Sequence, residues 1–167
     1  MRIRRYYFNK LFYPFKSFIR NEVKILKRIS QNDYIVQLFE IYENAQELIL
    51  IFELMEGGDL YEKVKSRQHY TEKEVWLIFL QIVKGVEFLH SHGIVHRDIK
   101  LQNVLVASKN SQTRVKIGDF SLAEYYTEKE MTIKCGTPGF MAPEIFAKNS
   151  YNEKVDIFST GIVLYIL

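Results

Sequence analysis

One short stretch of the chain places several chemically active groups close together. Residues 96–103 read His-Arg-Asp-Ile-Lys-Leu-Gln-Asn, with a carboxylate at Asp98, an ammonium at Lys100 and a carboxamide at Asn103. Asp98 can accept a proton, Lys100 can stabilise charge that develops on a phosphate, and Asn103 can hold a hard cation through its amide oxygen. The stretch therefore predicts a loop suited to phosphate chemistry.

Two further motifs follow this loop along the chain. Gly-Asp-Phe-Ser occupies residues 118–121, and Ala-Pro-Glu occupies residues 142–144. A single short motif arises by chance in many proteins, whereas three in a fixed order do not. In this order the motifs resemble those of eukaryotic protein kinases of the serine/threonine type, and the resemblance runs from about Arg20 to the last residue.

The resemblance implies an α+β, bilobal kinase-like fold of which the chain holds a part, truncated at both ends. We expect an incomplete, strand-rich small lobe with the hinge over about residues 1–55. The first half of a mostly helical large lobe is expected over about residues 56–167. The resemblance also implies that ATP and Mg²⁺ bind, and that the γ-phosphoryl group passes to serine or threonine hydroxyls of protein substrates.

Five residues match the catalytic and metal-binding positions of the family. Asp98 is expected to orient the substrate hydroxyl and accept its proton, with Lys100 beside the transferred phosphate. Thr137 is expected to bridge Asp98 and Lys100, an arrangement that favours serine and threonine over tyrosine substrates. Asn103 and Asp119 match the two ligands of Mg²⁺, and their oxygen donors suit that hard ion.

The segment that begins at Phe52 resembles the interlobe hinge, which binds adenine. Phe52 takes the gatekeeper position, while the Glu53 carbonyl and the Met55 amide are expected to bond the adenine edge. Asp59 lies where an acidic residue meets the ribose, and Leu105 is expected to form the floor of the pocket. Main-chain recognition leaves a weak signature, so taken alone this segment is equally a plain strand end.

Four residues are expected to support the site. Glu22 matches the helix glutamate that pairs with a strand lysine in the family, and Phe120 is expected to pack beneath that helix. His96 is expected to support Phe120 from the catalytic loop. Asp156 is expected to anchor the hydrophobic column of Leu26, Leu38, His96 and Phe120 that the resemblance implies. For Phe120 ordinary core packing predicts the same position.

Residues 127–143 correspond to the activation segment, and the run from Cys135 to Glu144 resembles calmodulin-dependent-like and related kinases. Arg97 matches the arginine that, in many members, pairs with a phosphate on this segment. Thr132 is the nearest candidate acceptor, although an unmodified threonine fits equally well. Glu144 is expected to be a buried charge that lacks its family arginine partner.

Several departures from the family pattern support other interpretations. No glycine-rich loop precedes Glu22, Arg4 stands near the position of the strand lysine, and Ser121 replaces a glycine. The chain also ends inside the apolar helix that begins at Asp156. These departures suggest a catalytically inactive kinase fragment or pseudokinase-like interaction module, or a piece of a longer, ordinary kinase.

Apolar periodicity and capping signals predict the elements that must position these groups. A capping box at Thr71 opens a long amphipathic helix that ends near Gly93, and Asp59 is expected to cap a short helix. The remaining helices are expected at 18–29 and 156–167, and the strands at 36–41, 48–52, 104–106 and 115–117.

Composition limits the kind of protein this can be. The 167 residues include 23 basic and 20 acidic side chains, mostly dispersed, so the charge does not indicate nucleic-acid binding. Cys135 is the only cysteine, and no signal-peptide core or membrane span is evident. We therefore expect a cytoplasmic protein, with the exposed apolar C-terminal helix as a docking surface for a partner.

Overall fold

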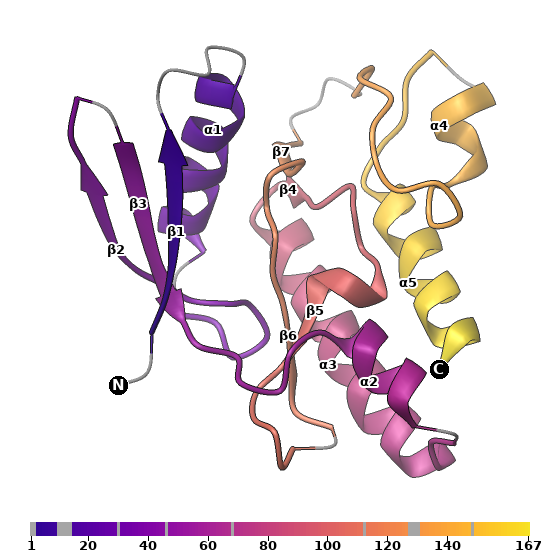
Figure 1. Ribbon diagram of the computed structural model, residues 1–167. Helices are drawn as coiled ribbons and strands as arrows, with labels where there is room; N and C mark the ends of the chain where they lie inside the picture. The colour runs from indigo at the N-terminus through magenta and orange to yellow at the C-terminus, as the bar shows by residue number, and fades with distance from the viewer. Residues whose placement is uncertain are drawn as a thin grey trace.

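Strands dominate the N-terminal part of the structure and helices dominate the C-terminal part (Figure 1). The computed structural model describes residues 3–9, 15–29, 31–45, 47–67, 69–111, 113–126, 131–147 and 149–167, with only the backbone described at 3–9 and 15–18. The expected α+β class, with a strand-rich part followed by a helical part, is confirmed.

The N-terminal part is a three-stranded antiparallel sheet with one helix. The strands β1 (Ile3–Asn9), β2 (Leu38–Glu43) and β3 (Glu47–Glu53) lie in the order β1-β3-β2. Helix α1 (Phe15–Arg28) lies beside the sheet (Figure 1). β1 pairs with β3 so that Arg4 lies opposite Phe52. The structure describes only the backbone of Arg4, so the sheet sets its register but not the direction of its side chain.

Two of the helices in the C-terminal part begin with the caps that the sequence predicts. Asp59 accepts a hydrogen bond from the Glu62 amide and starts α2 (Leu60–Ser66). The Thr71–Glu74 capping box is present at the start of α3 (Glu72–Ser91). Gly93, with a φ of +67°, follows the end of α3 and adopts the left-handed conformation that favours glycine. Helix α5 (Lys154–Ile166) and the short α4 (Pro143–Ala147) complete the helical part.

Short strands and one turn of 3-10 helix lie in the connections between these helices. The hairpin of β5 (Val104–Val106) and β6 (Val115–Ile117) is antiparallel, as expected. The 3-10 turn η1 (Leu101–Asn103) leads directly into β5. β4 (Ile94–Val95) pairs with β7 (Glu124–Tyr125). This pairing closes the segment between them, residues 96–123, into a loop.

The β5–β6 hairpin joins the two parts of the fold. The Val36 amide donates to the Ile117 carbonyl at 2.8 Å, and the Ile117 amide donates to the Tyr34 carbonyl at 2.8 Å. The Lys116 ammonium binds both carboxylate oxygens of Glu53, at 2.8 and 3.1 Å. One buried cluster also spans both parts, and includes Ile25, Leu26, Leu50, Ile78, Ile82 and Ile117.

Some elements differ from the expectation. Helix α1 begins at Phe15, earlier than expected, while β2 is shifted towards the C-terminus. β1, the β4–β7 pair and α4 were not expected; the pair and α4 are too short to show a period. Among the described residues, no helix is long and apolar enough to cross a membrane. Several apolar side chains of α5 are exposed, namely Ile157, Phe158, Leu164, Tyr165 and Ile166.

Candidate active site

Asp156 holds the loop that carries the candidate catalytic residues. Its carboxylate is fully buried at the start of α5 and accepts hydrogen bonds from the backbone amides of His96 and Arg97, both at 2.8 Å. His90 of α3 lies 2.9 Å from the same carboxylate. Two amides that no strand or helix pairs are thereby satisfied, and a buried carboxylate gains partners that stabilise its charge. Asp156 thus fixes the loop backbone just before Asp98.

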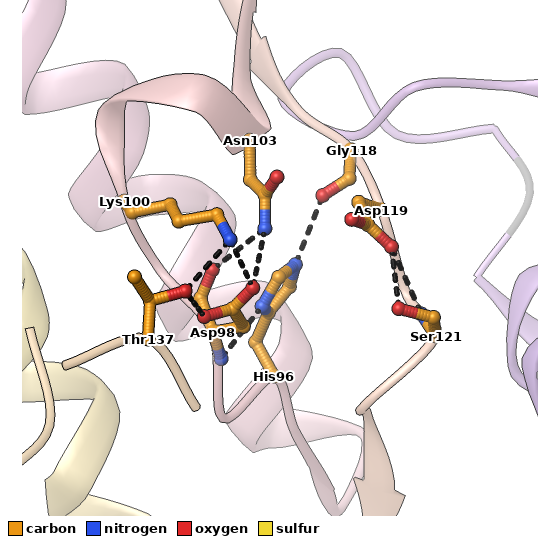
Figure 2. Close-up of polar contacts among 8 residues, drawn as sticks. All are labelled: His96, Asp98, Lys100, Asn103, Gly118, Asp119, Ser121 and Thr137. Carbon is orange, nitrogen blue, oxygen red and sulfur yellow. Dashed lines mark hydrogen bonds and ion pairs between the residues drawn. The ribbon is translucent and has the colours of Figure 1, made fainter. Parts of the chain in front are cut away.

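The His96 ring connects this loop to the segment that contains Asp119. Its Nδ1 accepts a hydrogen bond from the Asp98 amide at 3.2 Å, so the other ring nitrogen carries the proton. That Nε2 donates to the carbonyl of Gly118 at 3.0 Å (Figure 2). The ring also meets Phe120 edge to face, with centroids 5.0 Å apart. His96 therefore ties the segments before Asp98 and Asp119 to one another.

Three polar side chains meet around the Asp98 carboxylate. Lys100 Nζ lies 2.7 Å from Asp98 Oδ2 and donates to Thr137 Oγ1 at 2.7 Å. Thr137 in turn donates to Asp98 Oδ1 at 2.6 Å, which is the bridge expected from the sequence (Figure 2). Burial acts to raise the pKa of Asp98, but the hydrogen bonds from Lys100 and Thr137 outweigh it and hold that pKa below its ordinary value. Asp98 is consequently ionised at neutral pH.

The nitrogen and the oxygen of the Asn103 side-chain amide point in different directions. Its Nδ2 donates to the Asp98 carbonyl at 2.9 Å and to Asp98 Oδ2 at 3.0 Å. Because the nitrogen is directed at Asp98, the amide oxygen points away from it, towards the side on which Asp119 lies (Figure 2). Asn103 thus combines an anchor for Asp98 with an oxygen that can bind a cation.

A cavity of about 440 Å³ lies between the two parts of the fold, beside this cluster. It has the size and mixed character of small-molecule sites. All the predicted hinge and pocket residues line it, together with both predicted metal ligands: Phe52, Glu53, Met55, Asp59, Leu105, Asn103 and Asp119. Asp98, Lys100 and Thr137 are not among its lining residues. The cavity and the Asp98 cluster are therefore adjacent, and Asn103 belongs to both.

Asp119 has an unusual backbone conformation. Its φ is +59°, in the left-handed region that residues with a side chain seldom adopt. The carboxylate is exposed in the cavity, and Oδ1 accepts hydrogen bonds from the hydroxyl and the amide of Ser121, at 2.7 and 3.3 Å. Strained backbone of this kind concentrates at functional sites, because the surrounding structure must hold it in place.

Glu22 of α1 enters the same cavity from the N-terminal part. Burial and, to a lesser degree, the nearby Asp119 carboxylate raise its pKa to about 7, while a hydrogen bond from the Phe120 amide acts in the opposite direction. Phe120 itself is buried next to His96. Glu22 therefore lies close to the candidate metal ligand and is partly protonated at neutral pH.

Arg97, next to Asp98, is buried, and its guanidinium has three partners outside the catalytic loop. Its guanidinium donates to the Leu122 carbonyl at 2.6 Å and to the Tyr151 hydroxyl at 3.5 Å, and lies 3.6 Å from the Glu124 carboxylate. Tyr151 donates to the Ile133 carbonyl and pairs through its backbone with Met131, at 2.9 Å in both directions. Tyr151 therefore links the activation segment to the arginine beside Asp98.

Two other predicted residues occupy more open positions. Thr132 is exposed, directly after Met131, and none of the contacts described for Arg97 involves it. Glu144 lies in the first turn of α4 and is partly exposed, so it is not the buried charge that was expected. Carboxylates in the first turn of a helix are favoured by the helix dipole.

The donors in the cavity fit Mg²⁺ better than they fit a softer metal. Asn103 and Asp119 offer an amide oxygen and a carboxylate, the ligand types that Mg²⁺ prefers. In the parts of the chain that the structure describes, no group of three or more His, Cys, Asp and Glu side chains could hold a metal ion. Mg²⁺ commonly takes only one or two protein ligands and completes its shell with water and substrate phosphates.

Several residues of the site were not singled out from the sequence. Val36, Leu50 and Gln102 line the cavity, and His90 and Tyr151 hold the loop and the activation segment. In the sequence, Val36 and Leu50 show only the apolar pattern of a strand. The contacts of His90 and Tyr151 join segments that are distant in the sequence, so no local pattern predicts them. Only the tight Asp119–Ser121 turn has a local signal, because an aspartate commonly accepts a hydrogen bond from the amide two residues on.

Comparison with known proteins agrees with this geometry. Residues 10–167 match the family model of the protein kinase domain. Calcium/calmodulin-dependent protein kinase type 1 of Macrobrachium nipponense is 38% identical over 149 residues, 89% of this chain and 43% of that protein. A probable myosin light chain kinase of Dictyostelium discoideum is 38% identical over 150 residues, with the same two shares. Calcium/calmodulin-dependent protein kinase type 1B of Rattus norvegicus is 36% identical over 152 residues, 91% of this chain and 44% of that protein.

The chain therefore belongs to the protein kinase family. The expected serine/threonine type and the likeness to calmodulin-dependent kinases are confirmed by these relatives. The chain spans less than half the length of the curated relatives that it matches.

Proposed function

We propose that this chain carries the catalytic site of a serine/threonine protein kinase, which transfers the γ-phosphoryl group of ATP to protein hydroxyls. The observation that carries the proposal is the Asp98–Lys100–Thr137 cluster beside a cavity that Asn103 and Asp119 line. An ionised carboxylate, an ammonium and two oxygen ligands for a cation are the groups that phosphoryl transfer requires. Their convergence from separate segments favours this function over an inactive interaction module.

The cavity supports binding of the nucleotide base at the hinge. Within the described residues the buried Met55 amide has no backbone acceptor, so it can donate to an adenine edge. Phe52 and Leu105 provide apolar surfaces of the same cavity. Asp59 uses one carboxylate oxygen to cap α2, which leaves the other for a ribose hydroxyl.

Asn103 and Asp119 would hold Mg²⁺ on the phosphate side of this cavity. The bound ion neutralises charge on the nucleotide phosphates and so assists their alignment. The chain's own contribution is to orient the two oxygen donors. Asn103 is fixed through its two hydrogen bonds to Asp98, and Asp119 through its bonds to Ser121.

Asp98 would accept the proton of the substrate hydroxyl as the phosphoryl group is transferred. Its depressed pKa keeps it ionised, and its hydrogen bonds to Thr137 and Asn103 orient the carboxylate. Lys100 stands beside the same carboxylate and can stabilise charge on the transferred group. Because Lys100 and Thr137 close around Asp98, the site favours a short aliphatic hydroxyl, hence serine or threonine.

The proposal also covers the division into lobes, the location and a docking partner. We assign about residues 1–55 to the small lobe and hinge and about 56–167 to the large lobe, since the cavity lies between these parts. The cytoplasmic location stays a prediction. Docking of a partner protein on the exposed apolar side chains of α5 also stays a prediction, which the exposure of Ile157 and Tyr165 makes testable.

Nucleotide binding can be tested separately from turnover. Millimolar Mg·ATP should raise the Tm of the purified chain, and Asp119→Asn should reduce that shift. Asp98→Asn should retain it, because Asp98 does not line the cavity. No shift for the wild-type chain would contradict the proposed site.

Turnover is tested by phosphate incorporation into a generic acceptor protein. Asp98→Asn should lower the rate by about 10²–10⁴-fold, the usual contribution of a positioned acid or base. Amino-acid analysis of the product should find phosphoserine or phosphothreonine. A chain that binds Mg·ATP but incorporates no phosphate would instead support the inactive-module interpretation.

A further inference from the structure

Ser121 makes a direct contact with the carboxylate of the candidate metal ligand Asp119. The Ser121 hydroxyl donates to Asp119 Oδ1 at 2.7 Å, and the Ser121 amide donates to the same oxygen at 3.3 Å (Figure 2). Hydrogen bonds to an ionised acceptor are stronger than those between neutral groups. The glycine that the kinase resemblance predicts at this position could supply the amide but not the hydroxyl.

The two bonds leave the other carboxylate oxygen available. Among the described residues, Ser121 is the only hydrogen-bond partner of Asp119, and it engages Oδ1 alone. Oδ2 lies on the side of the carboxylate that faces Asn103 (Figure 2). A carboxylate has lone pairs on both oxygens, so Oδ2 can bind a cation while Oδ1 keeps its bonds to Ser121.

Without these bonds, little in the described structure would orient the Asp119 side chain. The carboxylate is exposed, whereas its neighbour Phe120 is buried against His96, which fixes the backbone but not the carboxylate. The left-handed φ of Asp119 adds strain that the local bonds must offset. Glu22 lines the same cavity, and a negative charge on Glu22 would repel the Asp119 carboxylate.

We propose that Ser121 is a positioning residue for the metal site, whose hydroxyl holds Asp119 with Oδ2 directed at the Mg²⁺ position. This inference rests on the proposed function. Because the ligand is oriented before the ion arrives, less side-chain freedom is lost when Mg²⁺ binds. The hydroxyl therefore strengthens the coupling between Mg²⁺ and nucleotide without contributing to binding of the nucleotide alone.

The experiment measures the Kd of a non-hydrolysable ATP analogue twice, in EDTA and in excess Mg²⁺, and takes the ratio of the two values. This ratio reports the coupling between metal and nucleotide. Ser121→Ala should lower the ratio about three- to tenfold, the usual net contribution of one hydrogen bond. Its Kd in EDTA should stay that of the wild type. Ser121→Thr, which restores a hydroxyl, should return the ratio to the wild-type value.

Ser91→Ala is the matched control, since Ser91 is an exposed serine that donates to the Phe88 carbonyl, on α3 outside the cavity. It should leave both Kd values unchanged. A general structural role for Ser121 would instead weaken binding in EDTA and in Mg²⁺ alike. Ser121→Gly, which removes the same hydroxyl, provides the measurement if the alanine variant does not fold.

The outcomes separate this inference from the proposed function. If the wild-type Kd does not respond to Mg²⁺, the proposed function and this inference both fail. If the wild type responds and Ser121→Ala keeps the same ratio, the inference is wrong while the proposed function stands. A reduced ratio that Ser121→Thr does not restore would also overturn the role of the hydroxyl.

Discussion

The Thr137 hydroxyl donates to Oδ1 of Asp98 at 2.6 Å, across a separation of 39 residues. This bond fastens the activation segment to the candidate catalytic carboxylate. It also means that the geometry of Asp98 depends on a residue from a segment far along the chain. The orientation of the proton acceptor and the position of the activation segment are thus parts of one arrangement.

Replacement of this hydroxyl should impair catalysis more than nucleotide binding. Thr137→Val keeps the shape of the side chain but leaves Asp98 Oδ1 and Lys100 Nζ without their shared partner. We expect the rate of phosphate incorporation to fall by about tenfold or more, as for loss of one oriented polar contact at a reacting centre. Thr137→Ser should restore most of the activity. An unchanged rate in Thr137→Val would show that the bridge has no part in turnover.

The raised pKa of Glu22 gives stability a defined pH dependence. Unfolding lowers this pKa from about 7 to 4.5, so the folded state holds the proton more tightly between these values. Stability should therefore decrease as pH rises from 4.5 to 7, by up to about 3 kcal/mol, and this contribution should level off above pH 7.

Glu22→Gln tests this dependence through urea unfolding at several pH values, in EDTA and without nucleotide. The variant should lose the Glu22 contribution to the slope and be more stable than the wild type above pH 7, because glutamine does not ionise. Equal slopes for the two proteins between pH 4.5 and 7 would contradict the assignment of this titration to Glu22.

Thr71 should contribute measurably to the stability of α3. Its hydroxyl accepts from the Glu74 amide at 3.3 Å and its amide donates to Glu74 Oε2 at 2.9 Å, which satisfies two groups at the start of the helix. Thr71→Ala should lower the free energy of unfolding by about 1 kcal/mol. Thr71→Ser should be nearly neutral by the same measurement. Urea unfolding that finds the alanine variant as stable as the wild type would show that the cap is not needed.

The ion pair between Lys116 and Glu53 should stabilise the junction of the two parts. Both side chains are largely buried, with 12% and 21% of their surface exposed. Lys116→Met should lower the free energy of unfolding by about 2 kcal/mol, between the values for exposed and buried pairs. A double-mutant cycle with Glu53→Gln measures the coupling directly. The exposed Lys109→Met is the control and should change little.

Local signals in the sequence predicted much of the fold. Asp59 and the Thr71–Glu74 box start their helices as expected, because a cap depends only on residues within one turn. The β5–β6 hairpin follows equally from two short apolar runs around a polar turn. β1 is different, since its side chains show no clean alternation and its pairing partner β3 lies far along the chain.

In the candidate site, too, some contacts follow from the local sequence and others join distant residues. Asp98, Lys100 and Asn103 stand close in sequence, so their proximity could be predicted from the motif. The contacts of Asp156 with His96 and of Tyr151 with the activation segment join residues far apart, and only the folded chain brings them together. The Ser121 bond to Asp119 lies within one turn, where a serine in place of glycine predicts only a more restricted backbone.

The carboxylate of Asp156 has a consequence for the order in which a new chain can mature. The ribosome makes His96 and Arg97 about 60 residues before it makes Asp156, which accepts the hydrogen bonds of their amides. Until that acidic group has emerged, a nascent polypeptide holds Asp98 in a loop without its anchor. Competence for chemistry is therefore expected only after the helix that carries Asp156 has been made and has docked.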